Sequence, residues 1–147
     1  MNLENNQKTT VPSLPLTRKW YFLNLEGKII GRFAPKVVEL LRGKNEPNFL
    51  PNLDTGAYVV IVNASKAEFT GNKLNNKYYY NYSGYPSGMR KRSTKTMLND
   101  YPTELAKRII RGMMTHNKLG ENQLGRLFIY PNEQHQQQAK EKHFISI

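Results

Sequence analysis

Residues 58–62 read Tyr-Val-Val-Ile-Val and form the longest continuous apolar run of the chain, with four β-branched side chains. A short apolar run without polar alternation predicts a strand that is covered on both faces, as in a parallel sheet. A membrane-spanning helix needs about 20 such residues, so this run does not indicate one. We therefore expect residues 58–62 to form a central strand.

Upstream of this strand the sequence predicts a first strand and a helix. Residues 20–25 (Trp-Tyr-Phe-Leu-Asn-Leu) are rich in aromatic side chains, which favour a strand. From Gly31 onwards apolar residues recur at helical spacing, and Gly43 stands just past the expected end of that helix. Residues 45–56 contain two prolines and a glycine, and they predict a connecting loop.

Downstream, a basic and tyrosine-rich region is expected to be largely a long loop, with a short helix over residues 94–98. A further helix is expected from Pro102, with Asp100 as its cap. The buried stripe of this helix is predicted to consist of Leu105, Ile109, Ile110 and Met113. Residues 127–130 predict a final strand.

Strands that alternate with helices favour a layered α/β domain with a mostly parallel sheet. We expect one such domain over residues 18–131, a flexible N-terminal extension over residues 1–17 and a C-terminal tail over residues 132–147. A chain of 147 residues is long enough to bury a core without disulfides or a structural metal.

The composition points to an anionic partner. Lys and Arg number 22 against 11 Asp and Glu, which gives a net charge of +11 and favours nucleic acid or an anionic membrane surface. The absence of cysteine excludes disulfides, cysteine catalysis and thiolate metal sites. The histidines lack metal-ligand spacing and no glycine-rich nucleotide motif occurs, so we predict no metal, no cofactor and no small-molecule substrate. The N-terminus shows no secretory pattern, and we expect a soluble intracellular protein.

Residues 69–99 contain no acidic side chain. This segment carries the cations Lys73, Lys77, Arg90, Lys91, Arg92 and Lys95. It also carries the tyrosines Tyr78, Tyr79, Tyr80, Tyr82 and Tyr85. Lys and Arg bind phosphates, and tyrosine rings and hydroxyls contact bases and sugars, so the segment predicts an RNA-binding surface. The alternative is a solvated loop whose tyrosines pack onto the domain.

Further cations accompany the two predicted helices. Lys107, Arg108 and Arg111 occupy the polar side of the second helix, and Lys118 follows its end. Arg32, Arg42 and Lys44 flank the first helix. An ordinary solvated helix face is the competing interpretation of both sets.

Asp54-Thr55-Gly56 resembles the active-site string of retroviral-type aspartic proteases, in which two carboxylates share a proton. A hydrolase centred on Asp54 is therefore one alternative function. The second interpretation is a side-chain-bonded turn that leads into the strand at residues 58–62.

From Trp20 to Tyr130 the order and spacing of short strings resemble the bacterial-type ribosomal protein L13 family of the large subunit. The strings are Trp20-Tyr21, Gly27-Lys28, Gly31-Arg32, Leu41-Arg42-Gly43-Lys44, Asp54-Thr55-Gly56, Tyr58-Val59-Val60, Ile61-Val62-Asn63-Ala64 with Lys66, Thr70-Gly71-Asn72-Lys73, Ser83-Gly84-Tyr85-Pro86, Arg111-Gly112-Met113 and Asn117-Lys118-Leu119-Gly120. Ser87 departs from the family pattern, since a second glycine often stands there, and the glutamines at 136–138 depart from the usual family tail.

The resemblance implies a three-layer α/β/α domain around a four-stranded, mainly parallel sheet. It implies a structural protein, not an enzyme, that binds 23S-type large-subunit ribosomal RNA and supports assembly beside neighbouring large-subunit proteins. The expected location is the cytoplasmic, bacterial-type ribosome rather than an organelle matrix, with no membrane partner.

Together, the basic pattern and the resemblance predict a set of RNA-binding residues. They are Arg18, Lys19, Arg32, Arg42, Lys44, Thr70, Gly71, Asn72, Lys73, Lys77, Tyr79, Tyr80, Ser83, Gly84, Tyr85, Arg90, Lys91, Arg92, Lys95, Arg111 and Lys118. Besides the hydrolase, a general basic module for RNA or a membrane surface is an alternative function.

Overall fold

The computed structural model describes residues 18–137 and 144–146, so the predicted N-terminal extension and part of the predicted tail lie outside the described residues. Its elements in chain order are β1 (Trp20–Asn24), α1 (Ile30–Arg42), β2 (Tyr58–Val62), the 3₁₀-helix η1 (Ala64–Lys66), α2 (Lys73–Asn76), β3 (Tyr78–Tyr82), β4 (Met89–Ser93), α3 (Thr94–Asp100), α4 (Pro102–Met113), α5 (Lys118–Leu124), β5 (Leu127–Ile129) and β6 (Phe144–Ser146). The strands and the first helix expected from the apolar patterns are present.

The main sheet has the strand order β5-β2-β1-β6, and each neighbouring pair is parallel. β1 and β2 pair over their whole length, from Trp20 opposite Tyr58 to Asn24 opposite Val62. Val59, Val60 and Ile61 have no exposed surface, as expected for an apolar strand with neighbours on both edges. The predicted mixed α/β class with a parallel sheet is confirmed.

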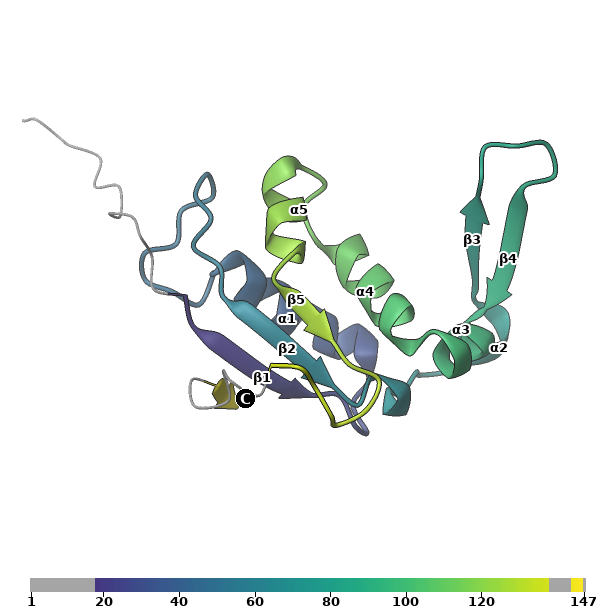
Figure 1. The fold of residues 1–147 in the computed structure, drawn as a ribbon, viewed down its shortest axis with the longest axis horizontal. Helices are drawn as coiled ribbons and strands as arrows, with labels where there is room; N and C mark the ends of the chain where they lie inside the picture. Colours follow the sequence, from purple (N-terminus) through teal and green to yellow (C-terminus); the bar gives the residue numbers. More distant parts are fainter. Residues whose placement is uncertain (1–17, 138–143, 147) are drawn as a thin grey trace, which may run out of the picture.

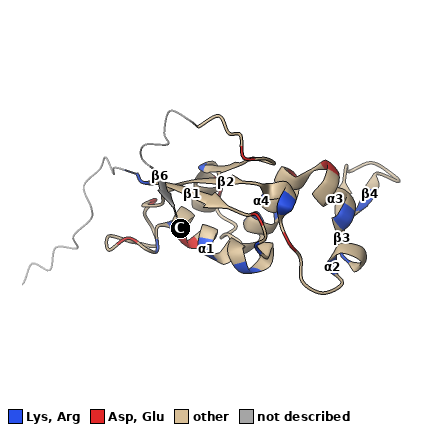
Figure 2. Cartoon of the chain, turned by 90° about the horizontal axis from the view of Figure 1, so that it is seen from below, with Lys and Arg blue, Asp and Glu red and all other residues tan. Residues whose placement is uncertain are grey.

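Helix α1 covers one side of this sheet and also packs against α4 and α5 (Figures 1 and 2). Its buried residues, among them Phe33, Val37 and Leu41, recur at helical spacing and belong to one hydrophobic core with β1 and β2. Gly43 ends the helix in the left-handed conformation, with φ +77°. A Cβ atom at Gly43 would lie 2.7 Å from the Thr55 hydroxyl oxygen, so this turn requires glycine.

The tyrosine-rich segment forms an antiparallel hairpin of β3 and β4, which projects from the body of the domain (Figure 1). The prediction of a long loop was therefore wrong. Gly88 accepts a hydrogen bond from Ser83 and donates one to Tyr85, which closes the turn. Aromatic residues favour strands, but no alternation of apolar and polar residues marked this hairpin, because neither of its faces belongs to the core.

Three details of the helices also differ from expectation. Asp100 does not cap α4, because it is the last residue of α3 and only Tyr101 separates the two helices. Met113 is 44% exposed, whereas Met114 turns into the core in extended backbone just after α4 ends. The short helices α2 and α5 were not predicted, since neither has an apolar stripe long enough to reveal helical spacing.

Candidate nucleic-acid interface

The β3–β4 hairpin has two faces, because side chains alternate along each strand and opposite residues share a face. Its register sets Tyr79 opposite Arg92 and Asn81 opposite Arg90 on what we call the inner face. On this face the Arg108 guanidinium of α4 lies 5.7 Å from the centroid of the Tyr79 ring and donates a hydrogen bond to Asn81 Oδ1. The inner face therefore docks the hairpin on the body of the domain.

The other face, here called the outer face, carries the side chains of Tyr78, Tyr80, Tyr82, Met89 and Lys91 beyond Ser93, which lies opposite Tyr78 and caps α3. All five side chains are exposed, and the exposed fraction rises along the strand from 41% at Tyr78 to 68% at Tyr82. Among the predicted site residues, Tyr79 thus supports the hairpin while Tyr80 is open to solvent. Tyr78 and Tyr82 belong to the tyrosine series that predicted an RNA-binding surface but were not among the candidate residues, and Met89 was not singled out. Only the strand register reveals that these three residues share a face with Tyr80.

Three cations of the hairpin region, Lys77, Lys91 and Arg92, contact aromatic rings instead of carboxylates. Lys91 Nζ lies 3.8 Å from the centroid of the Tyr78 ring, and Lys77 Nζ lies 5.3 Å from that of Tyr79. Arg92 is half-buried and stacks on Tyr101 at 4.7 Å. No ion pair found in the described part of the chain uses a cation from residues 69–99. These charges remain available for a polyanion.

Both turns that border the hairpin are exposed. The predicted residues Thr70, Gly71, Asn72 and Lys73 form the turn into α2, and Gly71 has φ +62°. Ser83, Gly84 and Tyr85 lie at the tip, where the Tyr85 side chain is 75% exposed. Lys95 is exposed on α3 below the hairpin.

A second group of cations lies on α4 and α5. Lys107, Arg111 and Lys118 are exposed, and the first two line a groove of about 390 Å³ between the helices. Arg108 differs from them, because it pairs with Glu104 at 3.5 Å and holds the hairpin. The expectation of a solvated helix face therefore overlooked the structural role of Arg108.

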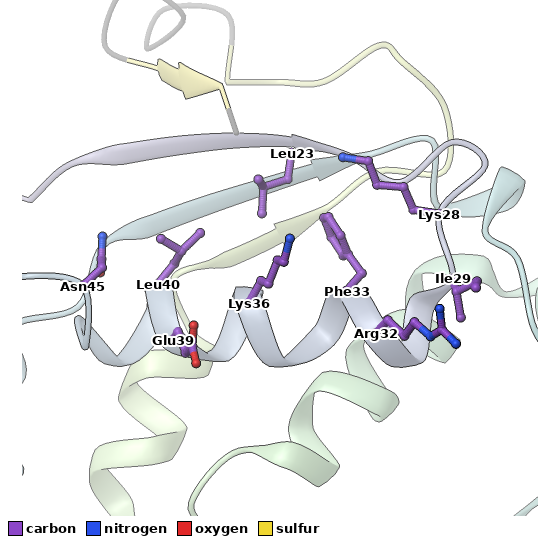
Figure 3. Close-up of a pocket in the computed structure, with 9 residues that line it drawn as sticks. All are labelled: Leu23, Lys28, Ile29, Arg32, Phe33, Lys36, Glu39, Leu40 and Asn45. Atoms are coloured by element: carbon purple, nitrogen blue, oxygen red, sulfur yellow. The ribbon is translucent and has the colours of Figure 1, made fainter.

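A third group surrounds α1. Arg32, Lys28 and Lys36 line a groove of about 540 Å³ beside Leu23, Phe33 and Leu40 (Figure 3). Lys28 and Lys36 were not among the predicted site residues, although Arg32 and Lys36 have the four-residue spacing that places them on one helix face. Arg42 is half-buried near the end of α1, and Lys44 is exposed just after it.

The two predicted site residues nearest the N-terminus of the described chain contact other protein groups. Arg18 donates a hydrogen bond to the Gly56 carbonyl oxygen at 2.8 Å and lies 3.4 Å from an Asp54 carboxylate oxygen. Lys19 pairs with Glu46 at 2.9 Å. The structure brings neither residue to the hairpin.

Asp54 is held by arginines. Arg126 is 8% exposed, and its two terminal nitrogens each donate to one Asp54 carboxylate oxygen at 2.5 Å. Burial alone would raise the pKa of Asp54, but hydrogen bonds and positive charge from Arg126 and Arg18 outweigh it and hold this pKa below its usual range.

This geometry contradicts the alternative of a hydrolase, because Arg126 binds both Asp54 carboxylate oxygens, whereas the protease mechanism needs this carboxylate to share a proton with a second one. The predicted local turn is also corrected, since the side chain of Asp54 bonds to a residue 72 positions away. Gly56 permits the close approach of this segment to the end of α1, because a Cβ atom there would lie 1.7 Å from the Leu41 carbonyl oxygen. Sequence reasoning missed Arg126, whose only signal was a single cation directly before an apolar strand.

Residues 18–137 and 144–146 contain no cluster of three His, Cys, Asp or Glu side chains that could hold a metal ion. Over the same ranges no helix has the length and apolar character needed to cross a membrane.

Comparison with known proteins gives one consistent family. The model of the family described as ribosomal protein L13 matches residues 18–136. The large ribosomal subunit protein uL13 of Acholeplasma laidlawii (strain PG-8A) is 39% identical over 132 residues, which are 90% of this chain and 93% of that protein. The uL13 proteins of Bacillus thuringiensis (strain Al Hakam) and Bacillus cereus (strain B4264) are each 42% identical over 123 residues, covering 84% of this chain and 85% of theirs.

Proposed function

Because the chain belongs to the ribosomal protein L13 family, we propose that it binds large-subunit ribosomal RNA as a structural constituent of the large ribosomal subunit and supports subunit assembly. The family consists of structural ribosomal proteins and is not an enzyme family. The proposed partners are 23S-type RNA and neighbouring large-subunit proteins in a cytoplasmic, bacterial-type ribosome.

The observation that carries this proposal is the set of exposed cations without acidic neighbours on a hairpin that projects from the domain. Arg90 and Lys91 are exposed on β4, and no carboxylate lies within residues 69–99 to neutralise them. Phosphates bound there would release condensed counterions, which makes the affinity depend steeply on salt. The cations along α4, α5 and α1 supply further positions for the RNA backbone.

The proposal includes the finer architecture that the family resemblance implies, three layers around a four-stranded sheet. Pairing of β6 with β1 supports the fourth strand. On the side of the sheet away from α1, His135 contacts the rings of Phe22 and Tyr130, which supports coverage of that face by C-terminal residues. The division into residues 1–17, 18–131 and 132–147 likewise remains a proposal.

Fractionation of a lysate on sucrose gradients at low and high salt tests the function. We expect the chain to migrate with the large subunit and to stay there in high salt. The Arg90→Ala/Lys91→Ala variant should dissociate at lower salt, because it loses two phosphate contacts. Its matched control, Arg90→Lys/Lys91→Arg, keeps both charges and should behave like the unchanged protein.

Direct titration with ribosomal RNA adds a quantitative test. The slope of log affinity against log salt should fall by about 1 to 2 in the Ala variant, at roughly 0.7 to 0.9 for each phosphate contact. Migration of the unchanged chain at the top of the gradient at every salt concentration would overturn the proposal. Equal affinity for RNA and for anionic vesicles would instead support the general basic module.

A further inference from the structure

We infer that the outer face of the β3–β4 hairpin is a stacking surface for unpaired RNA bases. The inference rests on the proposed function, since it assumes that RNA is the partner, and it names the kind of RNA segment that this face binds. The residues that carry it are Tyr78, Tyr80, Tyr82, Met89 and Lys91.

The spacing of the tyrosines suits stacked bases. Alternate residues on one face of a strand lie about 6.6 to 6.8 Å apart. Stacked nucleotides are about 3.4 Å apart, so one base fits between two neighbouring rings that stand out from the strand. Tyr80 and Tyr82 are such neighbours, and both are more than half exposed, at 55% and 68%.

The two faces of the hairpin show why the outer tyrosines need a partner. On the inner face, Tyr79 is covered by contacts with Arg108 and Lys77. On the outer face, Tyr82 and Met89 are directly opposite each other and are 68% and 63% exposed. Adjacent large apolar side chains in water indicate a binding surface more often than a solvated one. The body of the domain therefore leaves this face available to another molecule.

The charges around this face favour nucleic acid as that molecule. Lys91 lies opposite Tyr80 in the register, and its ammonium group lies over the Tyr78 ring, 3.8 Å from the ring centroid. The positive charge therefore stands at the Tyr78 end of the ring row, next to the exposed rings of Tyr80 and Tyr82, where it can meet a phosphate of a stacked strand. A protein partner would need acidic groups to match the cations and apolar groups to match the rings. A single RNA strand presents phosphates and flat bases in regular alternation.

The RNA segment must be unpaired. In an A-form duplex the base faces are covered by their neighbours, and the deep, narrow major groove excludes side chains. A loop, bulge or single strand exposes base faces that can stack on tyrosine. The outer face is therefore expected to discriminate between unpaired and duplex RNA, whereas phosphate contacts alone bind both.

The test uses the full chain with two fluorescent probes, a 12-nucleotide single-stranded RNA without self-complementarity and a 12-base-pair RNA duplex. Tyr80→Val/Tyr82→Val removes both rings and keeps residue types that favour strands. We expect its affinity for the single strand to fall about tenfold or more, since stacking contributes about 1–3 kcal/mol per base. The salt slope and the affinity for the duplex should stay unchanged, because no charge is lost.

Tyr80→Phe/Tyr82→Phe is the matched control. It keeps the rings, so we expect single-strand affinity within about threefold of the unchanged protein. Equal single-strand affinity of the Val variant and the unchanged chain would overturn the inference and leave the proposed function standing. Equal losses for the Val and Phe variants would also overturn it, because the hydroxyls would then carry the contact. Binding of neither probe by the unchanged chain would contradict the proposed function as well.

Discussion

β2 and β3 are both five-residue strands rich in residues that favour β-structure, yet they occupy opposite environments. Three residues of β2 have no exposed surface, whereas three of the four tyrosines in β3 are at least 41% exposed. Burial of apolar surface stabilises β2. β3 gains little from burial and depends on its pairing with β4 and on the Arg108 contacts. The comparison shows that β2 belongs to the core that holds the fold together, while β3 presents its side chains to solvent.

The same contrast applies to the arginines. Arg126 is buried, and its guanidinium is shared between Asp54 and the carbonyl oxygens of Ala57 and Leu41. Arg90 is exposed and has no carboxylate partner in the described residues. A buried arginine with its hydrogen bonds satisfied stabilises the fold, whereas an exposed one costs little and remains free to bind phosphate.

The largest expected effect is the loss of stability when a residue of the hydrophobic core is truncated. Leu41 on α1 has no exposed surface. Leu41→Ala should lower the free energy of unfolding by about 2–5 kcal/mol, because it leaves a cavity against the sheet. Tyr80→Val on the hairpin should change the same quantity by less than about 0.5 kcal/mol. Chemical denaturation measures both changes. Comparable losses of unfolding free energy in the two variants would contradict the division into a buried core and an exposed hairpin.

Arg126→Met should have the next largest effect. The variant leaves the Asp54 carboxylate without its main partner, and we expect a loss of about 2 kcal/mol near neutral pH. The loss should be smaller than for a fully buried pair, because the Asp54 side chain is 22% exposed and keeps Arg18. The control Lys66→Met removes an exposed cation paired with Glu26 and should cost little.

The pH dependence of stability tests whether Arg126 stabilises the fold through the Asp54 carboxylate. The pKa of Asp54 is lower in the folded than in the unfolded protein, so its contribution is complete above the unfolded-state pKa of about 4. As the pH falls below that value the contribution diminishes, and it is lost once the pH passes below the folded-state pKa. The difference in unfolding free energy between the unchanged protein and Arg126→Met should therefore narrow below about pH 4. A constant difference from pH 7 to pH 2 would show that Asp54 is not the group that Arg126 stabilises.

Arg108→Ala tests whether the hairpin is held separately from the core. Removing the guanidinium breaks the contacts with Tyr79 and Asn81. Amide hydrogens of β3 and β4 should exchange about three- to tenfold faster, while those of β2 should not change. Lys107→Ala on the same helix is the control, since Lys107 is exposed and contributes to neither contact. Equal acceleration in β2 would mean that the hairpin and the core open together.

The smallest effect is expected at the tip of the hairpin. Ser87 has φ +57°, a left-handed conformation that costs a side-chain-bearing residue free energy. Ser87→Gly should slow amide exchange in β3 and β4 about twofold to fivefold without moving the global unfolding midpoint. Gly84→Ala, at φ +85°, should have the opposite effect. Faster exchange in Ser87→Gly would show that the hydroxyl group outweighs the backbone strain.

Much of the fold could be predicted because it depends on local patterns. The apolar run at residues 58–62 and the helical spacing before Gly43 led directly to β2 and α1. The hairpin could not be predicted in this way, because its strands lack a buried face and their pairing depends on a tip turn with unusual backbone angles. The candidate site was anticipated as a charged, tyrosine-rich segment, but the division of its tyrosines between two faces follows from the register of β3 and β4.

The sequence by itself determined the α/β class, the cationic segment without acidic residues and the family. Each of these depends on residue types at short or regular spacing, which chain geometry converts into strands, helices and charge density. Only the tertiary structure decided that Arg126 holds Asp54, that Arg108 holds the hairpin and that Tyr80 and Tyr82 face outward while Tyr79 faces the domain. The physical reason is that these contacts join residues 27 to 72 positions apart, and their formation depends on how the packed elements orient each side chain.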